Sequence, residues 1–192
     1  MKTKNKSFFP KYTAIICGVL TAAICGVMNL FLIPATEANT GGIRCFDMNI
    51  GYDYQTAQEF LRLIGERGRH IYLDYLLPLD FIFPVVYTLF FISLIFVLKK
   101  TFSPLMFLPL ALAAADYTEN VFSEIMLRSA VLPEATVKIA CAATVAKTGL
   151  MCLVILSILI MIAAAAVRKT EIPQRRAKPR KVKPTNPQKQ KP

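Results

Sequence analysis

Ionisable and polar side chains lie close together inside an apolar part of the sequence. In the stretch from Leu105 to Leu127, the residues Asp116, Glu119 and Asn120 occur within five positions. Because residues three and four apart share one face of a helix, these side chains are expected to point the same way. Two neighbouring carboxyl groups in apolar surroundings can act as a general acid and a general base, bind a ligand, or pair with a buried lysine.

Polar residues in two other apolar stretches are expected to face this set. A charged side chain at the centre of a bilayer costs at least about 2.5–3.5 kcal/mol, so such groups turn towards one another rather than towards lipid. The sequence predicts that Lys147 pairs with Asp116 or Glu119, and that the remaining carboxyl is protonated or hydrogen-bonded. We expect a polar pocket in the outer half of the bilayer, formed by Asp80, Tyr87, Asp116, Glu119, Asn120 and Lys147.

The histidine and cysteine content excludes several kinds of site. His70 is the only histidine, and it lies in "GERGRHIYLDY" beside the membrane, so a His-based zinc site and a Ser-His-Asp triad both lack support. The sequence has no Cys-x-x-Cys motif and no glycine-rich phosphate loop. Cys45 lies in the longest connection and is either a free buried thiol or a cysteine that pairs between chains. Accordingly, no metal and no cofactor are expected.

Four apolar stretches must position these residues. They cover about residues 13–33, 78–98, 105–127 and 139–167. Each reaches the roughly 20 residues that a helix needs to cross about 30 Å of hydrocarbon. The chain is 55% hydrophobic, and its charges are concentrated between and beyond these stretches. The sequence therefore predicts an all-α fold, a four-transmembrane-helix bundle in the cell membrane.

The distribution of Lys and Arg predicts the orientation of the bundle. Positive charge is concentrated in residues 1–12, at Lys99 and Lys100, and in residues 168–192, whereas residues 34–77 are not positive. Because positively charged segments stay in the cytoplasm, both termini are expected there and the 34–77 loop outside. The alternative is that the first helix is a signal peptide cleaved at Ala38. Its apolar core of 21 residues exceeds the usual 7–15, which favours a retained helix.

The segments outside the membrane have distinct patterns. Apolar residues recur at helical spacing over about residues 55–66, which predicts an amphipathic helix that lies on the outer membrane surface or caps the bundle. Gly65 and Gly68 are expected to end this helix, and Pro34 to end the first transmembrane helix. The proline-rich basic tail, residues 168–192, is expected to be disordered and to contact anionic lipids. Nucleic-acid binding is not expected, because no aromatic residues interleave with the cations.

Several motifs together resemble a family of uncharacterised four-helix bacterial integral membrane proteins. The resemblance rests on "IGERGRHIY" from Ile64 to Tyr72, on an Asp, a Pro and a Tyr at positions 80, 84 and 87, and on "DYTEN". It covers about half the chain, and no activity comes with it. The resemblance implies that an outer-loop motif also belongs to the candidate site, beside the pocket. Its residues are Gly65, Gly68, Arg69 and Tyr72.

Three classes of function are compatible with the sequence. The first is a protein that binds a lipid or small molecule in the pocket, or an enzyme that uses Asp116 and Glu119 as an acid–base pair. The second is a structural or assembly protein whose buried polar residues only fix helix packing. The third is a proton-coupled transporter, although the nearly continuous apolar sequence of the inner half argues against an open pore. The oligomeric state is not specified by the sequence.

Overall fold

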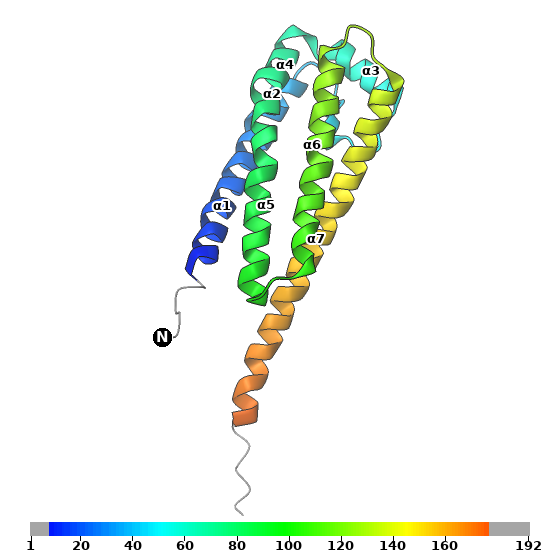
Figure 1. Ribbon diagram of the computed structural model, residues 1–192. Helices are drawn as coiled ribbons and strands as arrows, with labels where there is room; N and C mark the ends of the chain where they lie inside the picture. Colours follow the sequence, from blue (N-terminus) through cyan, green and yellow to red (C-terminus); the bar gives the residue numbers. More distant parts are fainter. Residues whose placement is uncertain (1–7, 177–192) are drawn as a thin grey trace, which may run out of the picture.

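Long helices lie side by side along most of the chain (Figure 1). The computed structural model describes the backbone of residues 8–176 and the side chains of residues 10–167. This part of the chain is helical apart from short turns and connections, and it contains no strand. The predicted all-α class is therefore confirmed.

Three helical segments are long and apolar enough to cross a membrane. They are Pro10–Glu37, Gly65–Lys99 and Glu134–Val167. The fourth apolar stretch also forms a helix, α6 (Phe107–Arg128), but its acidic residues make it less apolar, and it is not one of the three. The chain is a helical membrane protein with several candidate spans.

The first span bends without ending at its proline. Helix α1 (Phe8–Val27) continues through the π-helical turn η1 (Met28–Leu32) into α2 (Ile33–Glu37). The prediction that Pro34 ends this helix is wrong. Pro34 lies in the first turn of α2, where its missing N–H is least needed, and the wider turn of η1 precedes it.

The connection from α2 to α5 (Leu77–Lys99), called the outer connection because it is predicted to lie outside the cell, folds into a layer over one end of the bundle, called the outer end. It contains the 3₁₀ turn η2 (Phe46–Met48), helix α3 (Tyr54–Leu63) and helix α4 (Gly65–Ile71). Helix α3 is the amphipathic helix predicted near residues 55–66, and Asp53 caps it by accepting a hydrogen bond from the Thr56 amide at 2.8 Å. This hydrogen bonding lowers the pKa of the Asp53 carboxyl below its ordinary value.

The two glycines of this connection behave differently. Gly65 separates α3 from α4, because its φ of +65° is a left-handed conformation that favours glycine. The prediction that Gly68 also breaks the helix is wrong, since Gly68 lies inside α4. Its role is close packing: a Cβ atom at Gly68 would lie 2.9 Å from the Thr36 carbonyl oxygen of α2.

The second span is longer than its apolar core. Helix α4 continues through the π-helical turn η3 (Tyr72–Leu76) into α5 (Leu77–Lys99), so the segment begins well before the predicted residue 78. Pro78 lies in the first turn of α5, and Pro84 lies inside the helix. The helix ends at Lys100, which adopts a left-handed conformation with φ of 61°.

Two further helices complete the bundle. A short connection with the 3₁₀ turn η4 (Pro104–Met106) leads into α6, and α7 follows (Glu134–Arg176). Helix α7 extends past the bundle (Figure 1). It includes residues 168–176, which corrects the prediction that disorder begins at residue 168. The rest of that tail, residues 177–192, lies outside the described residues.

The helices pack in the order α1, α5, α6 and α7. The closest contacts join α6 with α7, α1 with α5, and α5 with α6, whereas α1 and α7 are not among the closely packed pairs of the described chain. An apolar cluster at the outer end joins the outer connection to the helices, and a second cluster fills the inner end between α5, α6 and α7. The polar residues lie between these two clusters.

Candidate functional site: a polar pocket between the helices

A lysine on α7 joins two carboxylates of α6. The Lys147 ammonium lies 3.2 Å from Oδ1 of Asp116 and also contacts Oε2 of Glu119. The side chains of Asp116 and Glu119 are 4% and 0% exposed, so both charges depend on Lys147 rather than on water. The predicted ion pair is confirmed, and it includes both carboxylates instead of one.

Hydroxyl groups bind the remaining oxygens of these two carboxylates. Tyr87 of α5 donates a hydrogen bond to Oδ2 of Asp116 at 2.9 Å. Thr144 of α7 donates a hydrogen bond to Oε1 of Glu119 at 2.6 Å. These five side chains connect α5, α6 and α7, and the network leaves no oxygen of Asp116 or Glu119 without a partner. Asp116, Glu119, Lys147, Tyr87 and Thr144 are called the lysine network below.

Asp80 has a different environment from the lysine network. The Asn120 side chain donates a hydrogen bond to the Asp80 backbone oxygen at 3.0 Å, which ties α6 to α5. The Asp80 residue is only 7% exposed. Among the described residues, no hydrogen bond or ion pair reaches its carboxylate. A buried carboxylate without a partner is unusual, since buried charges are normally paired or hydrogen-bonded.

A cavity of about 250 Å³ separates Asp80 from the lysine network. Of the six residues predicted to form the pocket, Asp80, Asp116 and Lys147 line it. Tyr87, Glu119 and Asn120 do not line it; they hold the residues that do. The rest of the lining is Cys25, Met28, Asn29, Asp47, Met48, Phe83, Thr148, Met151 and Cys152.

The cavity opens between the first and last helices. Cys25 of α1, Asn29 of η1 and Cys152 of α7 line it, and all three residues are exposed. Helices α1 and α7 are not among the closely packed pairs of the described chain, and these exposed lining residues indicate that the cavity opens between them. Both helices belong to candidate membrane spans, so this opening lies on a membrane-facing side of the bundle.

Asp47 also lines the pocket, although the sequence pattern did not predict it. It lies in η2, the turn of the outer connection that is inserted between the helices. Its Oδ1 atom is buried and has no hydrogen-bond partner. Burial raises the pKa of the Asp47 carboxyl above its ordinary value, and the nearby Lys147 opposes this rise. The only sequence signal is an acid beside Cys45 and Phe46 in a connection rich in turn-forming residues, which is weak.

Contacts of the outer connection hold η2 in place. Glu37 Oε1 accepts a hydrogen bond from the Cys45 amide at 2.7 Å. The ring of Phe46 lies 4.8 Å from that of Phe60 and 6.3 Å from that of Tyr72, measured between centroids. Cys45 is a free, fully buried thiol, and burial raises its pKa. This agrees with the first of the two alternatives for Cys45.

The residues of the outer-loop motif do not line the pocket; they hold the outer connection together and join it to the helices. Arg69 donates hydrogen bonds to the Leu127 carbonyl at the end of α6 and to the Leu61 carbonyl of α3, the latter at 3.3 Å. Tyr72 belongs to the aromatic cluster that holds η2. Gly65 and Gly68 allow the sharp α3–α4 turn and its close packing on α2.

The floor of the pocket is apolar and tightly packed. Below the lysine network, buried side chains of α5, α6 and α7 fill the inner half of the bundle. Among the described residues, the inner half contains the buried polar residues Thr88 and Ser103, and the Thr88 hydroxyl donates a hydrogen bond to the Pro109 carbonyl at 3.3 Å; neither residue lines the pocket. The buried residues of this inner cluster are Tyr87, Phe91, Ile95, Met106, Leu112, Val154, Ile158 and Met161.

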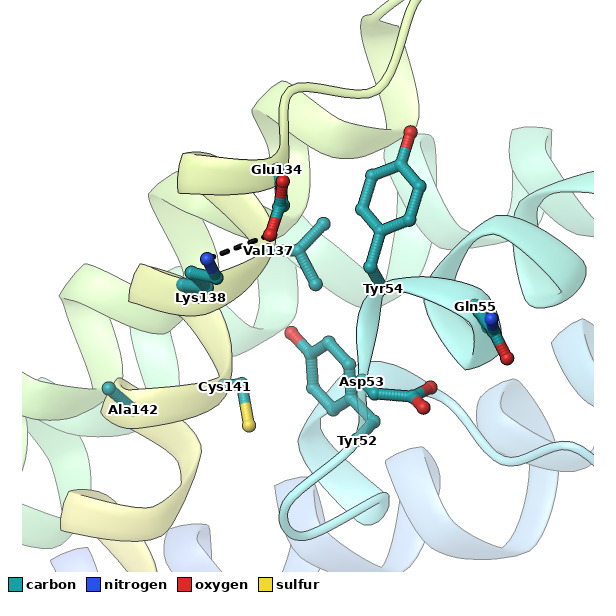
Figure 2. Close-up of a pocket in the computed structure, with 9 residues that line it drawn as sticks. All are labelled: Tyr52, Asp53, Tyr54, Gln55, Glu134, Val137, Lys138, Cys141 and Ala142. Carbon is teal, nitrogen blue, oxygen red and sulfur yellow. Dashed lines mark ion pairs between the residues drawn. The ribbon is translucent and has the colours of Figure 1, made fainter.

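A second cavity, of about 540 Å³, lies at the outer surface between α3 and α7. Figure 2 shows Glu134 and Lys138 of α7 on one side, joined by an ion pair of 2.7 Å, and Tyr52 and Tyr54 on the other. The Tyr52 hydroxyl is buried and has no hydrogen-bond partner. None of the predicted site residues lines this cavity.

Other candidate chemistry finds little support in the geometry. Within residues 10–167, no three His, Cys, Asp or Glu side chains are grouped so that they could hold a metal ion. His70 is exposed and pairs with Asp74 at 2.9 Å, away from the pocket. Comparison with protein-family models, with curated proteins and with solved structures finds no match for this chain. The pocket itself therefore carries the functional argument.

Proposed function

We propose that the protein is a four-span membrane protein of the cell membrane, with both termini in the cytoplasm and with α6 as the fourth span. Helix α6 has 22 residues and is therefore about 33 Å long, which matches the roughly 30 Å of hydrocarbon. It packs between α5 and α7. Its two central acids, Asp116 and Glu119, are buried and point inwards, and Glu124 near its end pairs with Arg128. Helix α6 is less apolar than its neighbours, but its buried acids Asp116 and Glu119 face the interior of the bundle and not the lipid.

The function that we propose is binding of a lipid or small molecule in the pocket between the helices. The observation that carries this proposal is the Asp80 carboxyl group, which is buried, has no partner among the described side chains and borders a cavity of about 250 Å³. A network that only fixed helix packing would satisfy its own polar groups. A ligand that donates hydrogen bonds or carries a positive charge would satisfy Asp80.

The lysine network supports a packing role for some of the predicted residues. Asp116 and Glu119 are both held by Lys147 and by hydroxyl groups, so their oxygens are already occupied. We therefore favour binding over acid–base catalysis by this pair. The packed inner cluster likewise favours a closed pocket over a path across the bundle for protons.

Native mass spectrometry of gently purified, full-length protein tests this function. We expect a bound small molecule or lipid on the wild type, and its loss from Asp80→Asn, because that variant removes the unpaired charge at the cavity. The matched control is Asp74→Asn, the same change six positions earlier in the same helical segment, where the acid is 58% exposed and pairs with His70. This control should retain the bound molecule.

Two results would count against ligand binding. One is a wild-type protein that retains no molecule in any mild detergent, together with an Asp80→Asn variant that is equally abundant and unchanged in thermal stability. The other is Asp80→Asn and Asp74→Asn losing the same molecule to the same extent. Either result would favour a buried polar network that serves packing alone.

A further inference from the structure

The pocket has more carboxyl groups than cationic groups. Its surroundings contain four carboxyl groups, those of Asp47, Asp80, Asp116 and Glu119, and one ammonium group, that of Lys147. Lys147 lies against Asp116 and Glu119, so it is already shared by two of the four. The other two, Asp47 and Asp80, border the cavity without a cation. Their position indicates that an occupant of this cavity supplies positive charge.

The lining of the cavity indicates the kind of cation. A hard metal ion takes six or more oxygen ligands, or several carboxylates at short range. No group of three such side chains is placed to hold a metal within the described chain. Around Asp47 and Asp80, the lining is instead apolar and contains Met28, Met48 and Phe83. Methionine and aromatic side chains of this kind suit an alkyl-substituted ammonium group.

The size and opening of the cavity indicate how such a molecule would lie. At about 250 Å³, the cavity is smaller than the roughly 300–1,000 Å³ of pockets that enclose a drug-sized ligand. It holds a headgroup but not a long chain. The opening between α1 and α7 passes exposed Cys25 and Cys152 on membrane-spanning helices, where an alkyl chain would meet lipid.

We propose that the pocket recognises the ammonium group of an organic amine, held between Asp47 and Asp80, with the apolar part of the amine extending between α1 and α7 into the membrane. This inference rests on the proposed function and names the chemical class of its ligand. The lysine network fixes the position of α6 and α7. The two unpaired acids, Asp80 of α5 and Asp47 of η2, make the cavity selective for a positively charged ligand.

Alkylation of two native cysteines provides a direct readout. Full-length protein is placed in nanodiscs of phosphatidylglycerol, whose headgroup carries no cation, and is treated with N-ethylmaleimide. Site-resolved mass spectrometry then measures alkylation of Cys25 and Cys152, which line the opening. Cys141 serves as the internal reference, because it lies at the other cavity. The probes are hexadecylamine, hexadecanol with the same chain and no charge, and butylamine as a short water-soluble amine.

We expect hexadecylamine to slow alkylation of Cys25 and Cys152 and to leave Cys141 unchanged. A charge-assisted hydrogen bond favours binding by about tenfold or more, so hexadecanol should require at least about ten times the concentration for the same protection. Asp80→Asn and Asp47→Asn should each weaken protection by hexadecylamine about tenfold. In Asp74→Asn, which changes an acid outside the cavity, hexadecylamine should protect Cys25 and Cys152 as it does in the wild type.

The other outcomes separate this inference from the proposed function. Equal protection by hexadecanol and hexadecylamine overturns recognition of ammonium and leaves the pocket as a ligand site. If butylamine protects the cysteines at the same concentration as hexadecylamine, ammonium recognition is upheld. The proposal that the amine enters from the membrane is then overturned. No protection by any probe, together with no co-purified molecule, overturns both proposals. Asp47→Asn, which changes the outer connection, keeps the test decisive if Asp80→Asn is poorly folded.

Discussion

Lys147 is the residue on which the polar interior depends most. One ammonium group contacts Asp116 and Glu119, and the two carboxylates have almost no exposure to water. Removing one partner of a buried ion pair is more harmful than removing both, because the remaining charge is left without compensation. The Tyr87 and Thr144 hydroxyl groups provide hydrogen bonds but no positive charge.

Replacement of Lys147 should therefore be severe, and a second change should partly reverse it. We expect Lys147→Met to lower stability by about 3–5 kcal/mol, because both carboxylates lose their cation. Adding Glu119→Gln should recover part of this loss, since the amide keeps a hydrogen bond with Thr144 and removes one charge. Thermal unfolding in detergent and abundance in the membrane measure both effects.

Lys138→Met is the matched control for that experiment. Lys138 lies on the same helix in an exposed ion pair with Glu134, and exposed pairs contribute little. Its replacement should leave the melting temperature nearly unchanged. A stable Lys147→Met protein, or a double variant less stable than Lys147→Met alone, would contradict the interpretation of Lys147 as the shared counter-ion.

Sequence and structure agree best for residues that lie on long helices. The pairing of Lys147 with the acids of α6 could be predicted, because helical spacing fixes the face and the rise fixes the depth. Asp47 could not be predicted in the same way. Its position depends on the Glu37–Cys45 hydrogen bond and on packing of Phe46, and both join residues whose proximity no local pattern reveals.

Among the elements, the outer connection determines how the pocket is covered. Helices α3 and α4 lie over the outer end of the bundle, and Arg69 joins this layer to the bundle. Its guanidinium reaches carbonyl oxygens at the ends of two helices, Leu61 of α3 and Leu127 of α6. Carbonyls at a helix end lack intrahelical donors, so a cation there satisfies them and interacts favourably with the helix dipole.

Replacing Arg69 should loosen this layer without disturbing the lysine network. We expect Arg69→Met to lower stability by about 1–3 kcal/mol, the usual contribution of hydrogen bonds to a charged group. Amide hydrogen exchange should become faster in residues 127–133 and in η2, while residues 112–120 keep their protection. Arg62→Met is the matched control, since Arg62 is exposed and pairs with neighbouring Glu59. Equal exchange in the two variants would contradict the role given to Arg69.

Element types could be predicted more reliably than their boundaries. The helices follow from apolar length, and α3 follows from its amphipathic spacing. The boundaries at Pro34 and Gly68 were predicted wrongly, because packing overrides the local preference of proline and glycine. The turn η1 accommodates Pro34. The close approach of α4 to Thr36 of α2 requires a glycine at position 68, because a Cβ atom there would contact the Thr36 carbonyl.

For the whole molecule, the number of crossings is decided by α6. With three crossings the termini lie on opposite sides of the membrane, and with four they lie on the same side. A helix outside the membrane would not lie antiparallel between α5 and α7 along their length (Figure 1). Two of the three acids that make α6 less apolar, Asp116 and Glu119, are buried against Lys147, and the third, Glu124, pairs with Arg128 near the end of the helix, so they do not oppose its insertion within the bundle.

Single-cysteine labelling in intact cells tests this topology directly. In a variant with the five native cysteines replaced by alanine, Thr101→Cys is placed before α6 and Ala130→Cys after it, both at exposed positions. A membrane-impermeant maleimide should label Ala130→Cys in intact cells, as it should label the control Asn39→Cys of the outer connection. Thr101→Cys should react only after the membrane is permeabilised, because Lys99 and Lys100 beside it favour the cytoplasm. Labelling of both cysteines from one side would show that α6 does not cross, and the acids of the pocket would then require a different membrane environment from the one proposed.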